Sequence, residues 1–441
     1  MDFQITGGTA TEIAESVRDL LERSAFRPDD ALPPVRALAE ELGVNRNTVM
    51  AAYRQLATAG LVVSRGRAGT RVADRSRVAQ EGFSGTGSLR DVGTGNPDPR
   101  FIPDPSAALT SMAGRPVLYG EPVIDTGLAT WAEEWMRADL GDRPGRLTIT
   151  SGAVDAVERL LAQALTRDDA VALEDPCFLA SIQTVRLGGY RAIPVPVDEE
   201  GMTVEGIRAA LDQGVRAVVC TPRAQNPTGA SLTPARAEQL RAVLAEHPYV
   251  LVIEDDHFSL LSRDTYHSIV GPDHRRWALV RSVSKFLGPD MCLALVASDP
   301  HTAERLALRL SPGTTWVSHL LQRLVHALVV DPGARARIAS ASAHYEQRNG
   351  EFARRLADRG ITCGGTDGLN LWVRLPQSAG TVAEGLRARG WLVRTGDEFA
   401  LRDAAASHHL RLTVHDLADP DAERLADDLG RLASVGSHRV G

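Results

Sequence analysis

The sequence predicts an α/β protein with two parts: an N-terminal winged helix-turn-helix domain, and a larger domain built on a mostly parallel sheet with a smaller C-terminal α+β lobe. Two patterns carry this prediction. Apolar residues recur at helical spacing within residues 11–60 and are followed by two short β-like segments. From about residue 91 onward, continuous apolar runs alternate with helical stretches, which is typical of a parallel sheet covered on both faces.

The composition excludes a small disulfide-stabilised scaffold and a disordered tail. The chain has 441 residues, of which 43% are hydrophobic and 24% are charged, so a large buried core is expected. Its four cysteines contain no CxxC pair, so no metal is expected. Because the chain has no apolar run near the ~18 residues of a membrane helix and no signal pattern at its N-terminus, we expect a cytoplasmic protein without a membrane partner.

Residues 1–74 are predicted to form the winged helix-turn-helix domain. The first helix covers the apolar positions 13, 17, 20 and 21, and the second follows Pro33-Pro34 and ends at Gly43. Asn45 is expected to cap the third helix, and strands at residues 61–63 and 70–72 flank a turn. Residues 75–90, rich in Gly, Ser and charge, are predicted to be a linker.

Basic charge is concentrated in the third helix and the β-ribbon of this domain. The whole chain has a net charge of −7, but residues 42–80 contain seven arginines and one acid. A winged helix-turn-helix places these two elements on DNA, so we expect double-stranded operator DNA as a partner. A solvated basic face on a small helical domain is the alternative.

Residues 91–441 are predicted to form the second domain, with its large part over about 91–333 and the smaller lobe over 334–441. The expected strands lie at residues 171–173, 192–197, 217–221, 249–253, 277–281 and 293–297, and the clearest helices at 153–164 and 234–245. Ligands of such sheets bind at the carboxyl ends of the strands, so the polar residues that follow these runs are candidates for a site.

Three segments at such positions carry polar chemistry. Ser151, Gly152 and Ala153 open a helix whose N–H groups suit a phosphate. Asn226 offers an amide donor for a phenolic oxygen, although its segment also fits an ordinary Pro-Thr-Gly turn. Residues 252–257 end an apolar strand in three acids and His257. For these, metal binding is one interpretation, although nothing else in the sequence supplies ligands at suitable spacing, and the pairing of an acid with a heterocyclic nitrogen is the other.

The fourth segment contains Lys285, the only lysine among 49 basic residues. Arginine cannot act as a neutral amine nucleophile because its pKa exceeds about 12, so the one lysine is a candidate for amine chemistry; chance retention at the surface is the alternative. Ser282 and Ser284 precede it at the two-residue spacing of an extended strand. A phosphate site, a phenol donor, an acid for a ring nitrogen and an imine-forming amine together indicate a pyridoxal 5'-phosphate (PLP) site.

The whole chain resembles the MocR subfamily of GntR-type transcription regulators, in which a winged helix precedes a domain similar to fold-type I PLP-dependent aminotransferases. The DNA module carries the resemblance at residues 32–39 (LPPVRALA) and 44–49 (VNRNTV). The larger domain carries it at residues 95–99, 119–122, 174–178 and 282–285. Residues 254–258 (EDDHF) and 314–319 (TTWVSH) are most similar to PtsJ-type members, regulators tied to vitamin B6 metabolism.

The resemblance implies a role for each candidate residue. Lys285 would bind PLP covalently, Asp255 would pair with the ring nitrogen, and Asn226 would donate to the ring O3′ atom. The same resemblance implies further PLP contacts by His257 at O3′, by Phe178 on the ring face, and by Ser151, Gly152, Ala153, Ser282 and Ser284 at the phosphate. Tyr119 would reach the phosphate in a partner subunit, which implies a homodimer, and Arg411 would bind the carboxylate of a substrate or effector.

The resemblance also implies the residues that contact DNA. Arg36, Arg46, Asn47 and Thr48 are expected near phosphates and base edges, with Arg65 and Arg67 on the wing.

Two positions depart from the family pattern. Most members have Tyr at the position of His257, although PtsJ-type members share the His. Members usually carry a phosphate-binding Arg where Cys292 stands, and the loss of one such contact costs about 1.5–3 kcal/mol. The hypothesis is that PLP binds weakly and reversibly, as a sensed ligand. The alternative is that Arg223 or Arg281 takes the place of the missing Arg.

Three functions follow from these features. In the first, the chain is a PLP-responsive transcription regulator, and PLP or an amino compound that condenses with it is the small-molecule effector. The second is an active PLP-dependent aminotransferase that carries a winged helix, and the third is a DNA-binding dimer with a cofactor-free aminotransferase-like domain. The winged helix favours the first function over the second. The intact Lys285 favours the first over the third, although Cys292 slightly favours the third.

Overall fold

The computed structural model describes residues 4–23, 25–27, 30–58, 61–64, 69–72, 89–111, 116–141, 143, 145–310, 316–401 and 408–434. The chain divides into two compact units, of which the first consists mainly of residues 1–80 and the second of most of the remainder. Within the described ranges, none of the helices combines the length and the hydropathy that crossing a bilayer requires.

The N-terminal unit has the predicted order of a winged helix-turn-helix. Its elements are α1 (Ala10–Glu22), α2 (Val35–Leu42), α3 (Arg46–Thr58), β1 (Val62–Ser64) and β2 (Thr70–Val72). Strands β1 and β2 pair in antiparallel fashion, and the helices enclose an apolar core that includes Ile13, Val17, Leu38, Val49 and Leu56.

Local signals set the helix boundaries in this unit. Thr9 and Glu12 form a capping box at the start of α1. Gly43 ends α2 in the left-handed conformation with a φ of 67°, which is why glycine suits this position. The Asn45 side-chain oxygen accepts the N–H of Asn47 at 2.9 Å and so caps α3, as the sequence predicted.

The second unit is built on an eight-stranded sheet with the order β4-β11-β10-β9-β8-β5-β6-β7. The strands are β4 (Arg146–Thr150), β5 (Ala170–Asp175), β6 (Arg191–Asp198), β7 (Gly201–Met202), β8 (Val215–Cys220), β9 (Leu251–Asp255), β10 (Trp277–Ser282) and β11 (Ala294–Ser298). The central strands β10, β9, β8 and β5 run parallel, as predicted. Two strands run against this direction within the predicted mostly parallel sheet: β11 is antiparallel to both β10 and β4, and β7 is antiparallel to β6.

Helices cover this sheet, and every residue of β9, β10 and β11 is buried, as expected for strands that are covered on both faces. The helices and short helical turns are η2 (Pro99–Phe101), α4 (Ser106–Ser111), α5 (Thr126–Leu140), α6 (Ala153–Ala164), α7 (Leu179–Leu187), α8 (Val204–Asp212), α9 (Pro234–Ala245), η3 (Ser259–Leu261), α10 (Ser284–Leu287), α11 (Pro300–Leu310) and α12 (His319–Val330). Helices α6 and α9 have the predicted bounds.

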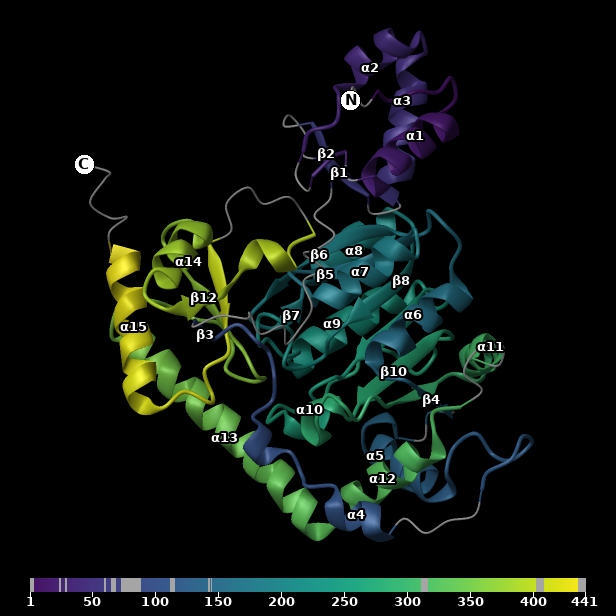
Figure 1. Cartoon of the computed structure of the whole chain (residues 1–441). Coiled ribbons are helices and arrows are strands. Elements are labelled where there is room, and N and C mark those ends of the chain that lie inside the picture. Colours follow the sequence, from purple (N-terminus) through teal and green to yellow (C-terminus); the bar gives the residue numbers. More distant parts are fainter. Residues whose placement is uncertain are drawn as a thin grey trace. The chain divides into compact units, whose positions relative to one another are not determined.

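A smaller lobe with its own apolar core completes the second unit (Figure 1). It contains α13 (Pro332–Ala357), β12 (Leu371–Arg374), α14 (Ala379–Arg387), β13 (Trp391–Leu392), β14 (Arg394–Thr395), η4 (Gly396–Phe399), β15 (His409–Leu412) and α15 (Asp419–Ser434). Strand β3 (Arg90–Asp91) pairs with β13. The chain therefore enters this unit through the lobe, at residues that the sequence assigned to the linker and the large part.

Candidate functional site

One cavity of about 190 Å3 brings together the polar segments that follow the strands. Its lining consists of Ser151, Gly152, Ala153, Val154, Phe178, Asn226, Asp255, His257, Ser282, Ser284, Lys285 and Cys292. Ten of these residues are the ones that the sequence assigned to a cofactor. They meet because β4, β8, β9 and β10 all point the same way, so that their carboxyl ends share one edge of the sheet.

Lys285 lies in α10, immediately after the carboxyl end of β10. Its Nζ atom donates a hydrogen bond to the backbone carbonyl of Gly95 at 3.1 Å. The two serines before it form a small hydroxyl network: Ser282 donates to Ser284 at 3.1 Å, and Ser284 also donates to the carbonyl of Met291 at 3.2 Å. The amine and the two hydroxyls therefore reach the cavity from one short segment.

The three consecutive acids at the end of β9 have three different environments. Glu254 faces away from the cavity and accepts hydrogen bonds from Tyr266, Ser268 and the N–H of Ile269. Asp255 lines the cavity. Side chains alternate along a strand, which explains why the neighbours of Asp255 point elsewhere.

Asp255 is a buried carboxyl group with an unusual pKa. Its Oδ1 atom is buried and has no hydrogen-bond partner among the residues that the structure describes. Burial, followed by the charge of Asp256, raises the pKa of Asp255 to about 7, while the ammonium of Lys285 acts in the opposite direction. A carboxyl group in this state favours a ligand that brings a hydrogen-bond donor or a positive charge.

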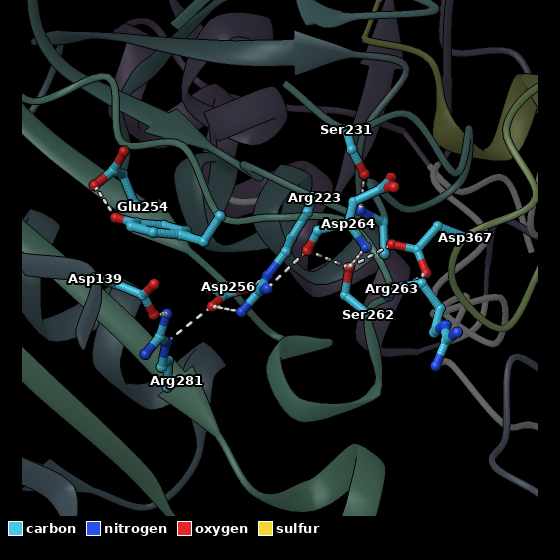
Figure 2. A network of polar contacts seen from close by, with 12 residues as sticks. Asp139, Arg223, Ser231, Glu254, Asp256, Ser262, Arg263, Asp264, Arg281 and Asp367 are labelled. Carbon is cyan, nitrogen blue, oxygen red and sulfur yellow. Dashed lines mark hydrogen bonds and ion pairs between the residues drawn. The ribbon is translucent and has the colours of Figure 1, made fainter. Parts of the chain in front are cut away.

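Asp256 belongs to a buried ion cluster next to the cavity (Figure 2). Arg223 binds both of its carboxylate oxygens at 2.8 and 2.9 Å, and Arg281 binds one of them at 2.8 Å. Arg281 also pairs with Asp139. Although burial opposes ionisation, the hydrogen bonds and charges of the two arginines hold the pKa of Asp256 below its ordinary value.

The structure bears on two alternatives that the sequence left open. Arg223 and Arg281 do not line the cavity, because both guanidinium groups bind Asp256. Neither replaces the arginine that is missing at Cys292. The three acids do not form a metal site either: among the described residues, no group of His, Cys, Asp and Glu is placed to hold a metal ion.

A second network holds the loop that carries Asn226. The Gln225 amide donates to Glu174 at 3.1 Å and to the carbonyl of Pro176 at 2.8 Å, while its oxygen accepts from Thr228. The Asn226 Oδ1 atom accepts a hydrogen bond from Arg411 at 3.2 Å. Sequence reasoning missed Glu174 and Gln225 as supports of the site, although both lie inside segments that it had singled out.

The other part of the cavity is formed by the start of α6, the two serines and Cys292. Gly152 has a φ of 95°, and a Cβ at this position would lie 3.3 Å from the Cys292 sulfur, so glycine fits where a larger residue would be strained. The Ser151 N–H donates to the Asp155 carboxylate at 3.0 Å. Cys292 is exposed and lies 3.4 Å from the Ser151 carbonyl.

Two residues expected at the site lie outside this cavity. Arg411 is fully buried and donates to the Gly93 carbonyl at 2.7 Å as well as to Asn226, and its guanidinium lies 4.7 Å from the centre of the Phe399 ring. Tyr119 is 87% exposed, and its ring centre lies 5.4 Å from that of Trp316.

The expected DNA contacts lie at the surface of the N-terminal unit. Arg36, Arg46 and Asn47 are exposed, and Thr48 is half-buried. Arg46, Asn47 and Thr48 form the first turn of α3. Arg65 and Arg67, the two residues expected on the wing, lie outside the described residues.

Comparisons with known proteins agree with both units. Residues 9–72 match the family described as bacterial regulatory proteins, gntR family, and residues 117–429 match aminotransferase class I and II. The vitamin B6 salvage pathway transcriptional repressor PtsJ of Salmonella typhimurium is 47% identical over 96% of this chain and 98% of its own length. The pyridoxine biosynthesis transcriptional regulator PdxR of Corynebacterium glutamicum is 27% identical over 68% of each chain.

Solved structures show the same fold. The kynurenine aminotransferase of Pyrococcus horikoshii superposes with a TM-score of 0.70 at 21% identity, covering 80% of this chain and 92% of that one. The expected fold class and the expected family are therefore confirmed. The chain belongs to the MocR-type regulators of the GntR family, which join a GntR DNA-binding domain to an aminotransferase class I and II domain.

Proposed function

We propose that this protein is a PLP-responsive transcription regulator: the winged helix-turn-helix binds double-stranded operator DNA, and the aminotransferase-like domain binds PLP at the cavity around Lys285. The observation that carries the proposal is the meeting of the only lysine, the buried Asp255 carboxyl and two serine hydroxyls in one cavity. When bound, PLP supplies an aldehyde that condenses with amines and a ring that withdraws electrons.

The residues at one end of the cavity fit the ring of PLP, and we call Phe178, Asn226, Asp255, His257 and Lys285 the ring end. The buried Oδ1 atom of Asp255 needs a donor, which a protonated ring nitrogen provides. Asn226 and His257 carry polar groups for the ring oxygen, and Phe178 offers an aromatic face.

The remaining lining residues, apart from Val154, fit the phosphate group, and we call Ser151, Gly152, Ala153, Ser282, Ser284 and Cys292 the tail end. The first N–H groups of α6 have no partners inside the helix and attract anions. Tyr119 is exposed and does not line this cavity, and we propose that it reaches the tail end of a second subunit in a homodimer.

Both of the cations expected to contact ligands also hold the segment that follows the interdomain linker. Lys285 donates to the carbonyl of Gly95, and Arg411 donates to the carbonyl of Gly93. An aldehyde that condenses with the Lys285 amine would form a C=N bond and release its oxygen with two amine hydrogens as water, which would leave the nitrogen with fewer hydrogens for Gly95. A carboxylate at Arg411 would compete with Gly93 for the guanidinium. We propose that ligands change DNA binding by loosening these anchors, and that PLP or an amino compound is the effector.

The test is direct capture of the aldehyde. Purified protein is mixed with PLP, its visible spectrum is recorded before and after borohydride reduction, and the modified peptide is identified by mass spectrometry. We expect a visible band that borohydride removes, with the added mass on Lys285. Lys285→Ala should show neither signal while unfolding at a similar temperature. An unmodified Lys285 at saturating PLP would overturn the proposal.

The same samples separate the two other functions. Steady turnover of an amino donor and a keto acid would indicate an aminotransferase. Tight binding to operator DNA with no spectral response to PLP would indicate a cofactor-free DNA-binding dimer.

A further inference from the structure

We infer that the cavity recognises pyridoxal-type aldehydes chiefly through the ring, so that it binds phosphorylated and unphosphorylated forms with similar affinity. The inference rests on the proposed function and names its ligand class: aromatic aldehydes with a pyridine nitrogen and an adjacent hydroxyl, with or without a phosphate tail. Three features of the tail end carry it.

The first feature is charge. A phosphate monoester carries a charge of about −1.5 to −2 at neutral pH. The tail end offers two serine side chains, a thiol and backbone groups, and none of its six residues is charged. Hydrogen bonds to an ionised phosphate are charge-assisted from the phosphate side alone here, and with no cation among its six residues this end compensates the phosphate charge only partly.

The second feature is that the nearby arginines have other partners. Arg159, one turn along α6 from Asp155, binds the Asp155 carboxylate at 2.6 Å and reaches the carbonyl of Arg309. Arg223 and Arg281 share Asp256. Bringing any of these guanidinium groups to a phosphate would take one charged partner away from a carboxylate, and for Asp256 that carboxylate is fully buried.

The third feature is that several donors at the tail end already serve acceptors within the protein. The N–H of Ser151 donates to Asp155. The hydroxyl of Ser282 donates to Ser284, whose own hydroxyl donates to Met291. A phosphate that binds here exchanges existing hydrogen bonds for new ones, which reduces the net gain.

The ring end shows the opposite arrangement. Lys285, Asp255 and Asn226 are the residues that the proposed function assigns to the aldehyde, the ring nitrogen and the ring oxygen, and all three groups occur in both forms of the ligand. We therefore expect most of the binding free energy to come from features that the phosphate does not change.

The experiment compares PLP with 5'-deoxypyridoxal, which keeps the ring and aldehyde but has no tail oxygen that could cyclise onto the aldehyde. Dissociation constants are measured by spectroscopic titration for the full chain. For the wild type we expect the two constants to lie within about tenfold of each other, because a phosphate gains its hydrogen bonds here at the expense of bonds within the protein. A preference for PLP above about 100-fold overturns the inference.

Cys292→Arg places a cation at the tail end. It should lower the dissociation constant of PLP by about 10- to 100-fold, with less than about a threefold change for 5'-deoxypyridoxal. Tyr249→Arg is the matched control, because Tyr249 is 74% exposed and lies before β9, at the far end of that strand from Asp255. It adds the same charge outside the cavity and should change neither constant.

The outcomes separate the inference from the proposed function. Absence of binding by both aldehydes contradicts the proposed function itself. Tight binding of PLP alone by the wild type leaves the proposed function standing and overturns the inference. A second measurement does not depend on any variant: millimolar inorganic phosphate should displace little 5'-deoxypyridoxal or PLP from the wild type, whereas strong competition against PLP would contradict a weak phosphate site.

Discussion

The ring end and the tail end line the same cavity but differ in the charge of their groups and in how those groups are held. The ring end places a buried carboxyl, an amine and an amide on supports that are themselves fixed, such as the Asp256 cluster and the Gln225 network. The tail end consists of neutral groups, several of which already donate hydrogen bonds to one another or to neighbouring residues. The difference indicates a site that captures a ring firmly and a phosphate weakly, which suits a sensor whose ligand must leave again.

A closer comparison lies at the carboxyl end of β9, where Asp255 ends the strand, Asp256 follows it, and both are buried. Two arginines keep Asp256 ionised, with its pKa below the ordinary value. Asp255 has no such partner, so burial and the fixed charge of Asp256 raise its pKa to about 7. One carboxylate therefore serves the structure, and the other is available to a ligand.

The largest expected effect comes from removing the support of the ring end. Asp256→Asn leaves Arg281 and Arg223 buried without the carboxylate that they share, and we expect the free energy of unfolding to fall by about 3–5 kcal/mol. Urea denaturation measures it. The exposed pair of Arg146 with Glu304 is the control, because Arg146→Ala should cost less than about 1 kcal/mol. Similar losses in the free energy of unfolding for both variants would contradict a structural role for Asp256.

The second prediction concerns a variant that weakens ligand binding at the ring end without unfolding the protein. Asp255→Asn removes the charge that pairs with the ring nitrogen, and the dissociation constant of PLP should rise by about 10- to 100-fold. Titration of the visible band measures the change. An unchanged affinity would mean that the ring nitrogen does not depend on Asp255.

Although Asp255→Asn should weaken PLP binding, it should raise the stability of the ligand-free protein at high pH. The folded-state pKa of Asp255, about 7, lies above the ordinary value of 3.8, so the stability linked to this group is complete below the ordinary pKa and is lost as the pH rises through 7. Asp255→Asn removes that loss. Without ligand, the variant should therefore be more stable than the wild type at pH 8 and nearly equal at pH 4, and urea melts at the two pH values check the sign.

A smaller effect is expected at the tail end. Ser284→Ala removes one neutral hydroxyl, so the dissociation constant of PLP should rise by only about two- to tenfold. The constant of 5'-deoxypyridoxal, which has no phosphate, should not change. A loss of PLP affinity as large as the one expected for Asp255→Asn would contradict the difference between the two ends.

The smallest effect on the cavity is expected from a change in the DNA-binding domain. Arg46→Ala removes an exposed cation from the first turn of α3, so the salt dependence of binding to a selected DNA duplex should weaken by about 0.9 in log–log slope. The dissociation constant of PLP should stay the same. An unchanged salt slope would show that Arg46 does not contact the DNA backbone.

Much of the fold and of the cavity could be predicted because strand ends and helix starts are local features. The residues that follow β9 and β10, and those that open α6, were identified from short patterns, and topology brings them to one edge of the sheet. The direction of β11, which lies between β4 and β10, was harder to predict, because its antiparallel pairing depends on its neighbours rather than on its own apolar run.

Long-range partners could not be predicted. Arg223, Arg281 and Arg411 are similar in sequence terms, yet the first two bind Asp256 and the third binds Gly93 and Asn226. An arginine can bind any acceptor within reach, and that reach is a property of the folded chain. The backbone carbonyls of Gly93 and Gly95 leave no signature in side-chain patterns, so their contacts with the two cations were missed as well.

The most direct test of the account compares ligand capture with DNA binding in one titration. Labelled operator DNA and the visible band of the protein are followed together as PLP is added. We predict that the affinity for DNA changes with the same midpoint as the visible band, and that Lys285→Ala shows neither change while still binding DNA. A DNA response that persists in Lys285→Ala, or a fully modified Lys285 with unaltered DNA affinity, would contradict the account.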